Sequence, residues 1–232
     1  MRGLAQQPLD EDPVIAIDGP AGSGKSTVAR LVAERTGLRH LDTGATYRAL
    51  TLALLRLGVP LHDADAVADA AKGVDLALEL GPDRAGPVRV LLDGTDPGGE
   101  LRSPAVNAAV SEVAAVPQVR EQLAALQRAV ISVGGVVAEG RDIGTVVWPQ
   151  AEVKVFLTAE AGERARRRAG PAGDGESADA LARRDRLDSG RAVAPTKASP
   201  DAVVIDSTGR TPDAIADEIL ALVEAARSGT AR

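Results

Sequence analysis

Residues 14–26, VIAIDGPAGSGKS, decide the fold of this chain. The apolar residues 14–17 precede a segment, residues 19–26, that fits the phosphate-binding pattern G-x-x-x-x-G-K-[ST]. Its glycines let backbone N–H groups turn toward phosphate oxygens, and the helix that follows directs its positive end at the same point. We expect Lys25 to reach the β- and γ-phosphates of a nucleotide and Ser26 to contact Mg²⁺. The full set of expected phosphate-binding residues is Gly19, Pro20, Ala21, Gly22, Ser23, Gly24, Lys25, Ser26 and Thr27.

Composition narrows the class of protein. The 232 residues suffice for one domain with a full core, and 44% of them are hydrophobic. The formal net charge of −6 argues against a general nucleic-acid or membrane-surface binder, and the near absence of aromatic residues argues against a base-stacking platform. The chain has no cysteine and no apolar run that approaches 18 residues. We therefore expect a cytoplasmic monomer without nucleic-acid or membrane partners.

Hydrophobic periodicity predicts an α/β fold. Short apolar segments alternate with segments of helical period, which is typical of a doubly wound parallel sheet with helices on both faces. The sequence therefore predicts a P-loop NTPase-type domain with a five-stranded parallel sheet. The expected strands are residues 14–18, 39–41, 135–139, 153–157 and 203–206.

One region departs from this rhythm. Residues 74–80 and 88–92 alternate like antiparallel strands, and Asp93-Gly94 is typical of a hairpin turn into a short third strand. We interpret residues 60–116 as an inserted subdomain within a domain that spans residues 13–226. Residues 1–12 and 227–232 are expected to be tails, the first of them disordered.

Polar residues follow two of the expected strands. Ligands of such sheets lie at the carboxyl ends of the strands. Tyr47 and Arg48 come one helical turn after the second strand, while Arg141 and Asp142 follow the third in a turn next to glycine. Glu139, which ends that third strand, is a candidate to hold Mg²⁺ through water. A packed tyrosine and a structural Arg-Asp pair are the alternative interpretations.

Arginine is concentrated in residues 162–191. A glycine- and proline-containing loop separates two arginine-bearing segments, which suits a lid that closes over phosphates and excludes water. Solvated helix faces also explain arginine runs, and this alternative stays open for every member except Arg184 and Arg191. The cluster consists of Arg164, Arg166, Arg167, Arg168, Arg183, Arg184, Arg186, Asp188 and Arg191.

Taken together, five stretches resemble the bacterial cytidylate kinase family, and the resemblance extends from about residue 14 to residue 225. The P-loop alone is shared by many families, whereas the other four stretches are specific to this one. The five stretches are GPAGSGKS (19–26), LDTGATYRAL (41–50), GGELRSPAVNAAVSEVAAVPQVR (98–120), AEGRDIGTVVWP (138–149) and DRLDSGRAVAP (185–195). The family often has Ser at the position of Thr43 and Asp at that of Glu139.

The resemblance implies a function, namely γ-phosphoryl transfer from ATP to CMP or dCMP with Mg²⁺, and a role for each matching residue. Lys25, Arg141, Arg184 and Arg191 are implied to be catalytic, and Ser26 and Glu139 to hold the metal. The implied acceptor site comprises Thr43, Tyr47, Arg48, Ser111, Arg120, Arg141, Asp142, Asp188 and Arg191. Within it, Ser111, Arg120 and Asp142 read the cytosine edge, Asp188 holds the ribose hydroxyls, and Arg48, Arg141 and Arg191 clamp the acceptor phosphate.

Two other functions remain as alternatives. Another small-molecule P-loop kinase, for UMP or shikimate, shares the phosphate-binding loop, and only the segments around Ser111, Arg120 and Asp142 favour the cytosine nucleotide. A GTP-dependent switch needs an N-K-x-D motif after a late strand, and residues 195–198, PTKA, do not supply one.

Overall fold

The computed structural model describes residues 12–81, 85–169, 177–190 and 193–228. The expected tail up to residue 11 lies outside these ranges, as do residues 229–232. Asp12, the last residue of the expected amino-terminal tail, joins the fold, because its carbonyl oxygen accepts a hydrogen bond from the Gly135 N–H at 3.0 Å. At the other end, the last helix continues to Arg227.

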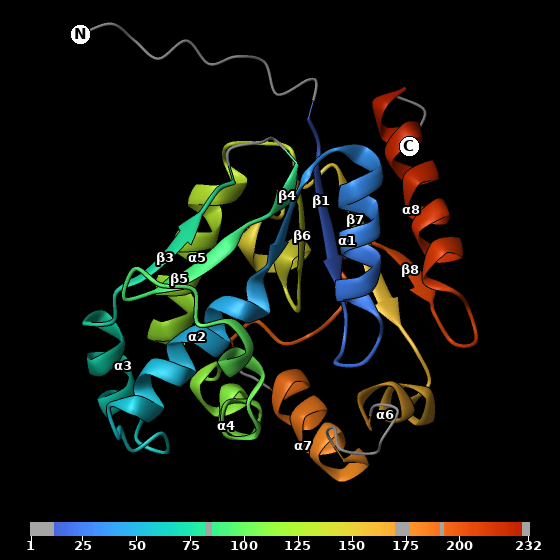
Figure 1. The fold of residues 1–232 in the computed structure, drawn as a ribbon. Coiled ribbons are helices and arrows are strands. Elements are labelled where there is room, and N and C mark those ends of the chain that lie inside the picture. Colours follow the sequence, from blue (N-terminus) through green and yellow to red (C-terminus); the bar gives the residue numbers. More distant parts are fainter. Residues whose placement is uncertain (1–11, 82–84, 170–176, 191–192, 229–232) are drawn as a thin grey trace, which may run out of the picture.

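The main sheet has six strands in the order β4-β2-β6-β1-β7-β8, and every neighbouring pair is parallel (Figure 1). The strand that carries the phosphate-binding loop therefore lies inside the sheet, between β6 and β7. The bounds are β1 Val14–Asp18, β2 Arg39–Asp42, β4 Gly86–Pro87, β6 Val136–Gly140, β7 Val153–Thr158 and β8 Val203–Asp206.

The α/β class and the parallel sheet are confirmed, but the predicted count of five strands is wrong by one. The additional strand β4 pairs with Arg39 and His40 of β2, and the Val88 N–H donates to the His40 carbonyl at 2.8 Å. Because β4 has two residues, one of them proline, its sequence shows no strand periodicity and is typical of a loop.

Eight α-helices lie within the described residues, and five of them begin at a side-chain cap. Asp42, Asp63, Ser103, Ser177 and Thr211 each accept a backbone N–H three residues ahead. The helices are α1 Lys25–Thr36, α2 Thr43–Arg56, α3 Ala64–Lys72, α4 Pro104–Val113, α5 Pro117–Ile131, α6 Ala161–Ala169, α7 Ala178–Ser189 and α8 Pro212–Arg227. A 3₁₀ turn, η1, spans Gly98–Arg102, and a π-turn, η2, spans Ile143–Val147.

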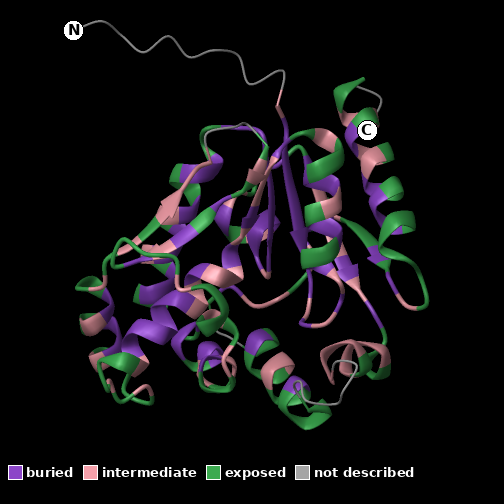
Figure 2. Ribbon diagram, in the orientation of Figure 1, coloured by how far each residue is buried: buried purple, intermediate pink, exposed green. Residues whose placement is uncertain are grey.

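Both faces of the sheet are covered, as predicted. Strands β1 and β6 are buried along their whole length (Figure 2), which explains their continuous apolar sequence. Ile15 and Ile17 pack on one face with residues of α1 and α8, such as Ile219. Val14 and Ala16 pack on the other face with residues of α5 and η2.

The antiparallel pair is present, but the expected third strand is not. Strand β3, Leu76–Glu79, pairs with β5, Arg89–Leu92. Asp93 and Gly94, which both have positive φ, form the turn, and after it Thr95 makes a single antiparallel bridge with Leu92. Pro97 then starts η1, and because proline has no N–H to donate, pairing with β5 cannot continue.

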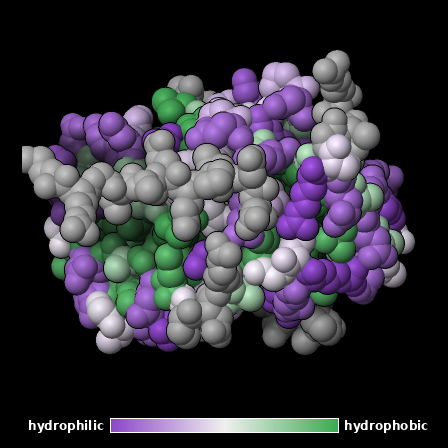
Figure 3. Space-filling view, turned by 90° about the horizontal axis from the view of Figure 1, so that it is seen from above, coloured by the Kyte–Doolittle hydropathy of each residue, from purple (hydrophilic) through white to green (hydrophobic). Residues whose placement is uncertain are grey.

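The two ends of the sheet differ. The strands' carboxyl ends face the space between α4, α6 and α7 (Figure 1). Figure 3 looks onto the opposite end, where hydrophilic side chains cover the side of α1 and α8 and a hydrophobic area lies on the other side. Within the described ranges, no helix is both long and apolar enough to cross a bilayer.

Candidate active site

A pocket with an empty volume of about 820 Å³ opens at the carboxyl ends of the strands. It is lined by the phosphate-binding loop, the start of α2, helix α4, the turn after β6 and helix α7. The expected site residues that line it are Ala21, Gly22, Lys25, Ser26, Thr43, Tyr47, Arg48, Ser111, Arg120, Glu139, Arg141, Asp142, Arg184 and Asp188. Arg191 lies outside the described residues. Gly19, Pro20, Ser23, Gly24 and Thr27 belong to the loop and to α1 but do not line the pocket.

The phosphate-binding loop packs tightly beneath two other elements. A Cβ atom at Gly19, where φ is 148°, would lie 2.0 Å from the Leu157 carbonyl oxygen of β7. One at Gly22 would lie 2.8 Å from the Arg164 carbonyl oxygen of α6. Gly24 occupies the N-cap position of helix α1, and no side chain caps this helix. Its first N–H groups can therefore bind an anion.

Lys25 is buried at the centre of this loop. Its Nζ donates to the Pro20 carbonyl at 2.6 Å. Burial lowers the pKa of the Lys25 ammonium well below its ordinary value, and the charge of Arg141 lowers it further, while Glu139 and Asp18 act in the opposite direction. An anion bound here would favour the charged lysine.

Ser26 and Glu139 form an oxygen-rich pair. The Ser26 hydroxyl donates to Glu139 Oε2 at 2.8 Å, and His40 Nε2 lies 3.2 Å from Glu139 Oε1. A hydroxyl and a carboxylate are the hard oxygen ligands that Mg²⁺ takes beside water and substrate phosphates. The residues present therefore fit Mg²⁺ bound together with a nucleotide.

Asp18, the last residue of β1, was not among the expected site residues. It is buried, and its two carboxylate oxygens accept the N–H groups of Ile143 and Gly144, each at 2.8 Å. Burial raises the pKa of Asp18 to about 6, although these two hydrogen bonds oppose the rise, and the charge of Asp142 adds to it. An ionisable residue at the end of an otherwise apolar strand was the available sequence signal.

The expected base-reading residues meet on one side of the pocket. Arg120, on α5, donates to Asp142 Oδ2 at 2.5 Å and to the Ala114 carbonyl at 3.1 Å. Its guanidinium carbon lies 5.4 Å from the centre of the Tyr47 ring. Both Arg120 and Asp142 are buried. Tyr47 packs against a core cluster and also lines the pocket.

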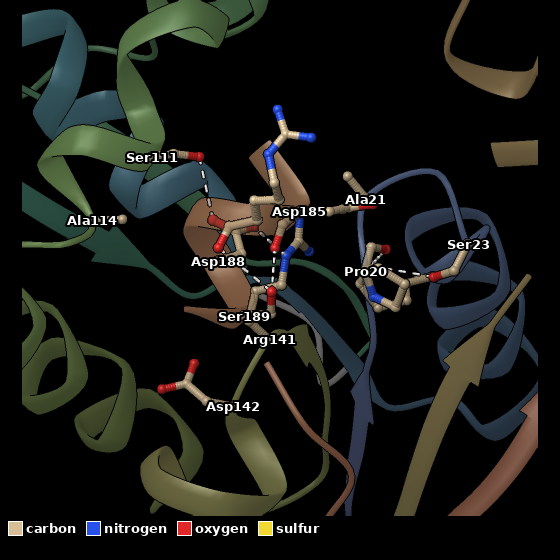
Figure 4. A network of polar contacts seen from close by, with 12 residues as sticks. Pro20, Ala21, Ser23, Ser111, Ala114, Arg141, Asp142, Asp185, Asp188 and Ser189 are labelled. Carbon is tan, nitrogen blue, oxygen red and sulfur yellow. Dashed lines mark hydrogen bonds and ion pairs between the residues drawn. The ribbon is translucent and has the colours of Figure 1, made fainter. Parts of the chain in front are cut away.

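Asp188, on helix α7, joins two other elements (Figure 4). Its Oδ1 accepts from the Ser111 hydroxyl of α4 at 3.2 Å, and its Oδ2 accepts from Arg141 Nε at 3.0 Å. Asp188 thus hydrogen-bonds to two other residues expected to bind the acceptor, although all three are far apart in the sequence.

Asp42 is a second residue to which the sequence pattern assigned no specific role, although it falls at the ligand-binding edge of the sheet. It caps α2, lines the pocket and accepts from Arg48 Nη2 at 2.6 Å, while Arg102 lies 3.9 Å away. Burial alone would raise the pKa of Asp42, but the charges of Arg48, His40 and Arg102 outweigh it and hold that pKa below its ordinary value. Asp42 therefore holds Arg48 at the pocket wall. Arg168 of the expected arginine cluster also lines the pocket, as do Gly44, Arg102, Val110, Ala114 and Gly140, to which the sequence assigned no role.

The arginines of α6 and α7 divide into two groups. Arg164 donates to the Ala21 carbonyl at 3.1 Å and pairs with Asp185. Arg167 donates to the Ser207 hydroxyl at 2.9 Å, which in turn donates to the Ser23 carbonyl. These contacts, together with the lining residues Arg168 and Arg184, tie both helices to the phosphate-binding loop and the pocket. The remaining ones, Arg166, Arg183 and Arg186, are exposed, as expected of solvated helix faces.

Comparison with known proteins gives the same assignment as the motifs. Residues 15–225 match the family described as Cytidylate kinase. The cytidylate kinase of Symbiobacterium thermophilum is 50% identical over 214 residues, which cover 89% of this chain and 94% of that protein. The cytidylate kinase of Mycobacterium avium (strain 104) is 49% identical over 232 residues, which cover 97% and 100% of the two chains.

Similarity to solved structures is weaker. A gluconokinase from Sinorhizobium meliloti 1021 has a TM-score of 0.46 and 19% identity over 94% of this chain and 95% of its own, a level that supports no functional assignment. The family match and the two close relatives are sufficient without it. The chain belongs to the cytidylate kinase family.

Proposed function

We propose that this chain transfers the γ-phosphoryl group of ATP to CMP or dCMP, with Mg²⁺, and releases ADP and the nucleoside diphosphate. One observation carries the proposal: the phosphate-binding residue Lys25 and the base-reading residue Asp142 line the same pocket. A donor whose phosphates are bound by Lys25 and an acceptor whose base is bound by Asp142 would meet inside it.

On the donor side, the task of the site is to hold charge. Lys25 and Arg184 bring positive charge to the phosphate chain, and the loop N–H groups orient it. Ser26 and Glu139 would hold Mg²⁺, which neutralises phosphate charge when it is bound. The reaction is an in-line transfer without a covalent enzyme intermediate, so catalysis consists of positioning and electrostatics.

On the acceptor side, recognition divides between the base, the sugar and the phosphate. The Asp142 carboxylate accepts from the exocyclic amine of cytosine, a group that uracil lacks. Arg120 holds this carboxylate in place, and Ser111 completes the base site. Asp188 binds the ribose hydroxyls beside Thr43 and Tyr47.

The acceptor phosphate is assigned to Arg48, Arg141 and Arg191. Arg48 and Arg141 are paired with Asp42 and Asp188, so an incoming phosphate competes with internal carboxylates for both guanidinium groups. No general base is required, because the attacking atom is an already ionised phosphate oxygen.

The proposed function implies a division of the chain into a kinase domain, an insert and a lid. Residues 13–226 form one kinase domain, residues 60–116 its acceptor-binding insert, and residues 162–191 a lid that excludes water from the transfer. In this proposal the chain acts as a monomer. It acts on small nucleotides without nucleic-acid or membrane partners, in the cytoplasm, where ATP and nucleoside monophosphates are available.

An acceptor panel tests the proposal. The purified protein is assayed for ADP release from MgATP with CMP, dCMP, UMP, AMP and shikimate. We expect CMP or dCMP to be the preferred acceptor. A higher kcat/KM with UMP, AMP or shikimate would overturn the assignment of the acceptor, and absence of ADP release with every acceptor would overturn the kinase assignment of the site.

A further inference from the structure

The link from Asp18 to the turn after β6 lies between the two halves of the pocket. Asp18 directly precedes Gly19, the first residue of the phosphate-binding loop. Its carboxylate reaches across to the turn after β6, where it accepts hydrogen bonds from the Ile143 and Gly144 N–H groups at 2.8 Å each. These partners are 125 and 126 residues away in the sequence and directly follow Arg141 and Asp142.

The turn has no other side-chain cap in the structure. Ile143 and Gly144 open the π-turn η2, and a helical start leaves its first N–H groups without backbone partners. Asp142, the residue at the cap position, makes no cap hydrogen bond, because its carboxylate is engaged by Arg120. Asp18 supplies from a neighbouring strand the cap that Asp142 cannot supply itself.

The geometry points to Asp18 as a positioning residue for the acceptor site. On the function proposed above, we infer that Asp18 fixes Arg141 and Asp142 at a set place relative to the phosphate-binding loop. The base-reading carboxylate and one phosphate-binding guanidinium then keep their distance from Lys25 whether or not a ligand is bound. A bidentate link of a carboxylate to two N–H groups is well suited to this task, since it restrains both position and orientation.

A purely structural role predicts different behaviour. If Asp18 only stabilised the fold, its replacement would lower the free energy of unfolding and leave the ligand affinities of the folded protein unchanged. A positioning role predicts a selective loss on the acceptor side. Trp148, the only tryptophan of the chain, reports on this region, because its backbone N–H donates to the Ile143 carbonyl at 2.7 Å at the end of η2.

The test compares Asp18→Asn with Glu152→Gln. Asn keeps the shape of the side chain but offers only one acceptor oxygen. Its amide NH2 group is a donor and cannot accept a hydrogen bond from the second N–H. Glu152 Oε2 accepts the Val14 N–H at 2.8 Å, so Glu152→Gln makes the same change in a carboxylate-to-backbone bond at the far end of the same strand. For each protein, CMP and ATP binding are measured separately by calorimetry, together with the kcat/KM ratio of CMP to UMP.

For Asp18→Asn we expect CMP affinity to fall at least about tenfold and ATP affinity to change no more than about twofold. The kcat/KM ratio of CMP to UMP should fall, and the fluorescence emission of Trp148 should shift. The Ile143 and Gly144 amides should exchange hydrogen with solvent faster. Glu152→Gln should change none of these quantities. Unchanged CMP affinity in folded Asp18→Asn, or equal losses in both variants, would overturn the inference.

Two further measurements cover the remaining outcomes. If Asp18→Asn does not fold, Asp18→Glu keeps both oxygens but displaces the turn by one methylene, and wild-type CMP affinity in that variant would equally overturn the inference. The amide exchange does not depend on which acceptor the enzyme uses. Faster exchange in a protein that prefers another acceptor would contradict the proposed function while leaving the link itself established.

Discussion

Lys25 shows how the pocket accumulates like charges. The charges of Arg141 and Arg184 both lower the pKa of its buried ammonium, and the charges of Glu139 and Asp18 raise it. Bound phosphates relieve this repulsion, so a nucleotide that binds only the folded state should also stabilise the fold.

At this scale, Lys25→Ala should lower kcat/KM for CMP phosphorylation by about 10²- to 10³-fold, since it removes a cation that stabilises the transferring phosphoryl group. The free energy of unfolding should stay unchanged or rise, because a desolvated charge among other cations disappears. Coupled ADP release and urea unfolding measure the two quantities. Lys72→Ala, which removes an exposed lysine on α3, is the control and should change neither. Near wild-type kcat/KM in Lys25→Ala would contradict the donor site.

Asp142→Ala tests acceptor recognition. It removes the carboxylate proposed to receive the cytosine amine, so the preference for CMP over UMP should fall by about 10²-fold or more. It also leaves the buried Arg120 without its ion-pair partner, which should lower the free energy of unfolding by about 3–5 kcal/mol. Competition assays with the two acceptors give the preference, and an unchanged ratio in the folded variant would argue against the assigned role.

The raised pKa of Asp18 has a consequence for stability. With a pKa of about 6 in the folded state against 3.8 in the unfolded state, the folded protein binds the proton more tightly. This contribution to stability is fully present below pH 3.8 and is lost as the pH rises through 6, a change of about 3 kcal/mol. Urea unfolding of wild type and Asp18→Asn at pH 4 and pH 7 should show the variant gaining stability relative to wild type with rising pH. A difference in unfolding free energy between the two proteins that does not change with pH would show that folding does not raise the pKa of Asp18.

The site residues divide into those that a sequence pattern can predict and those that it cannot. Residues 19–26 form one contiguous motif, so the phosphate-binding loop could be predicted without any knowledge of tertiary structure. The family motifs supplied the acceptor residues, most of which line the pocket. Asp18 and Asp42 act by holding other site residues, and for Asp18 those residues are more than 120 positions away. Such a role leaves no trace in local residue spacing.

Among the elements, helix starts were predictable because their signal is local. Ser103-Pro104, Ser177 and Thr211-Pro212 each combine a capping side chain with a helix former or a proline at the first position, and each starts a helix in the structure. Strand β4 and turn η2 depend instead on partners supplied by β2 and by Asp18. Their existence follows from the assembled sheet, so no window of sequence could indicate them.

Helix α3 provides a prediction at this scale. Its cap residue Asp63 accepts the N–H groups of Asp65 and Ala66, both at 3.1 Å. Asp63→Ala should lower the free energy of unfolding by about 1 kcal/mol, with kcat/KM unchanged because α3 does not line the pocket. Asp69→Ala, later in the same helix and exposed, is the comparison and should cost less. Equal losses in the two variants would show that the cap adds nothing.

For the molecule as a whole, the sheet separates stability from catalysis. The cluster that contains Ile15, Val155 and Ile219 lies between the sheet and the helices α1 and α8. The pocket lies at the carboxyl edge of the same strands, and α8 contributes no residue to it. Changes deep in this cluster should therefore alter how much protein is folded and leave its chemistry intact.

Ile219→Ala tests this separation. Ile219 is fully buried, so the variant should lose about 2–5 kcal/mol of unfolding free energy through lost burial and the cavity left behind. Leu222→Ala, at a partly buried position of the same helix, should lose less. The kcat of the folded fraction, measured at 25 °C with active-site titration, should match wild type in both. A large fall in the kcat of folded Ile219→Ala would show that α8 and the pocket are coupled.

The position of β1 has a further consequence for how the protein is made. Strand β1 leaves the ribosome before its partners β6 and β7, so that Ala16 meets its neighbours only after Ala138 and Lys154 have been synthesised. During translation its apolar side chains have no sheet to join, and contacts so distant in sequence slow folding after release. The segment that later binds phosphates should therefore be the one that chaperones protect longest.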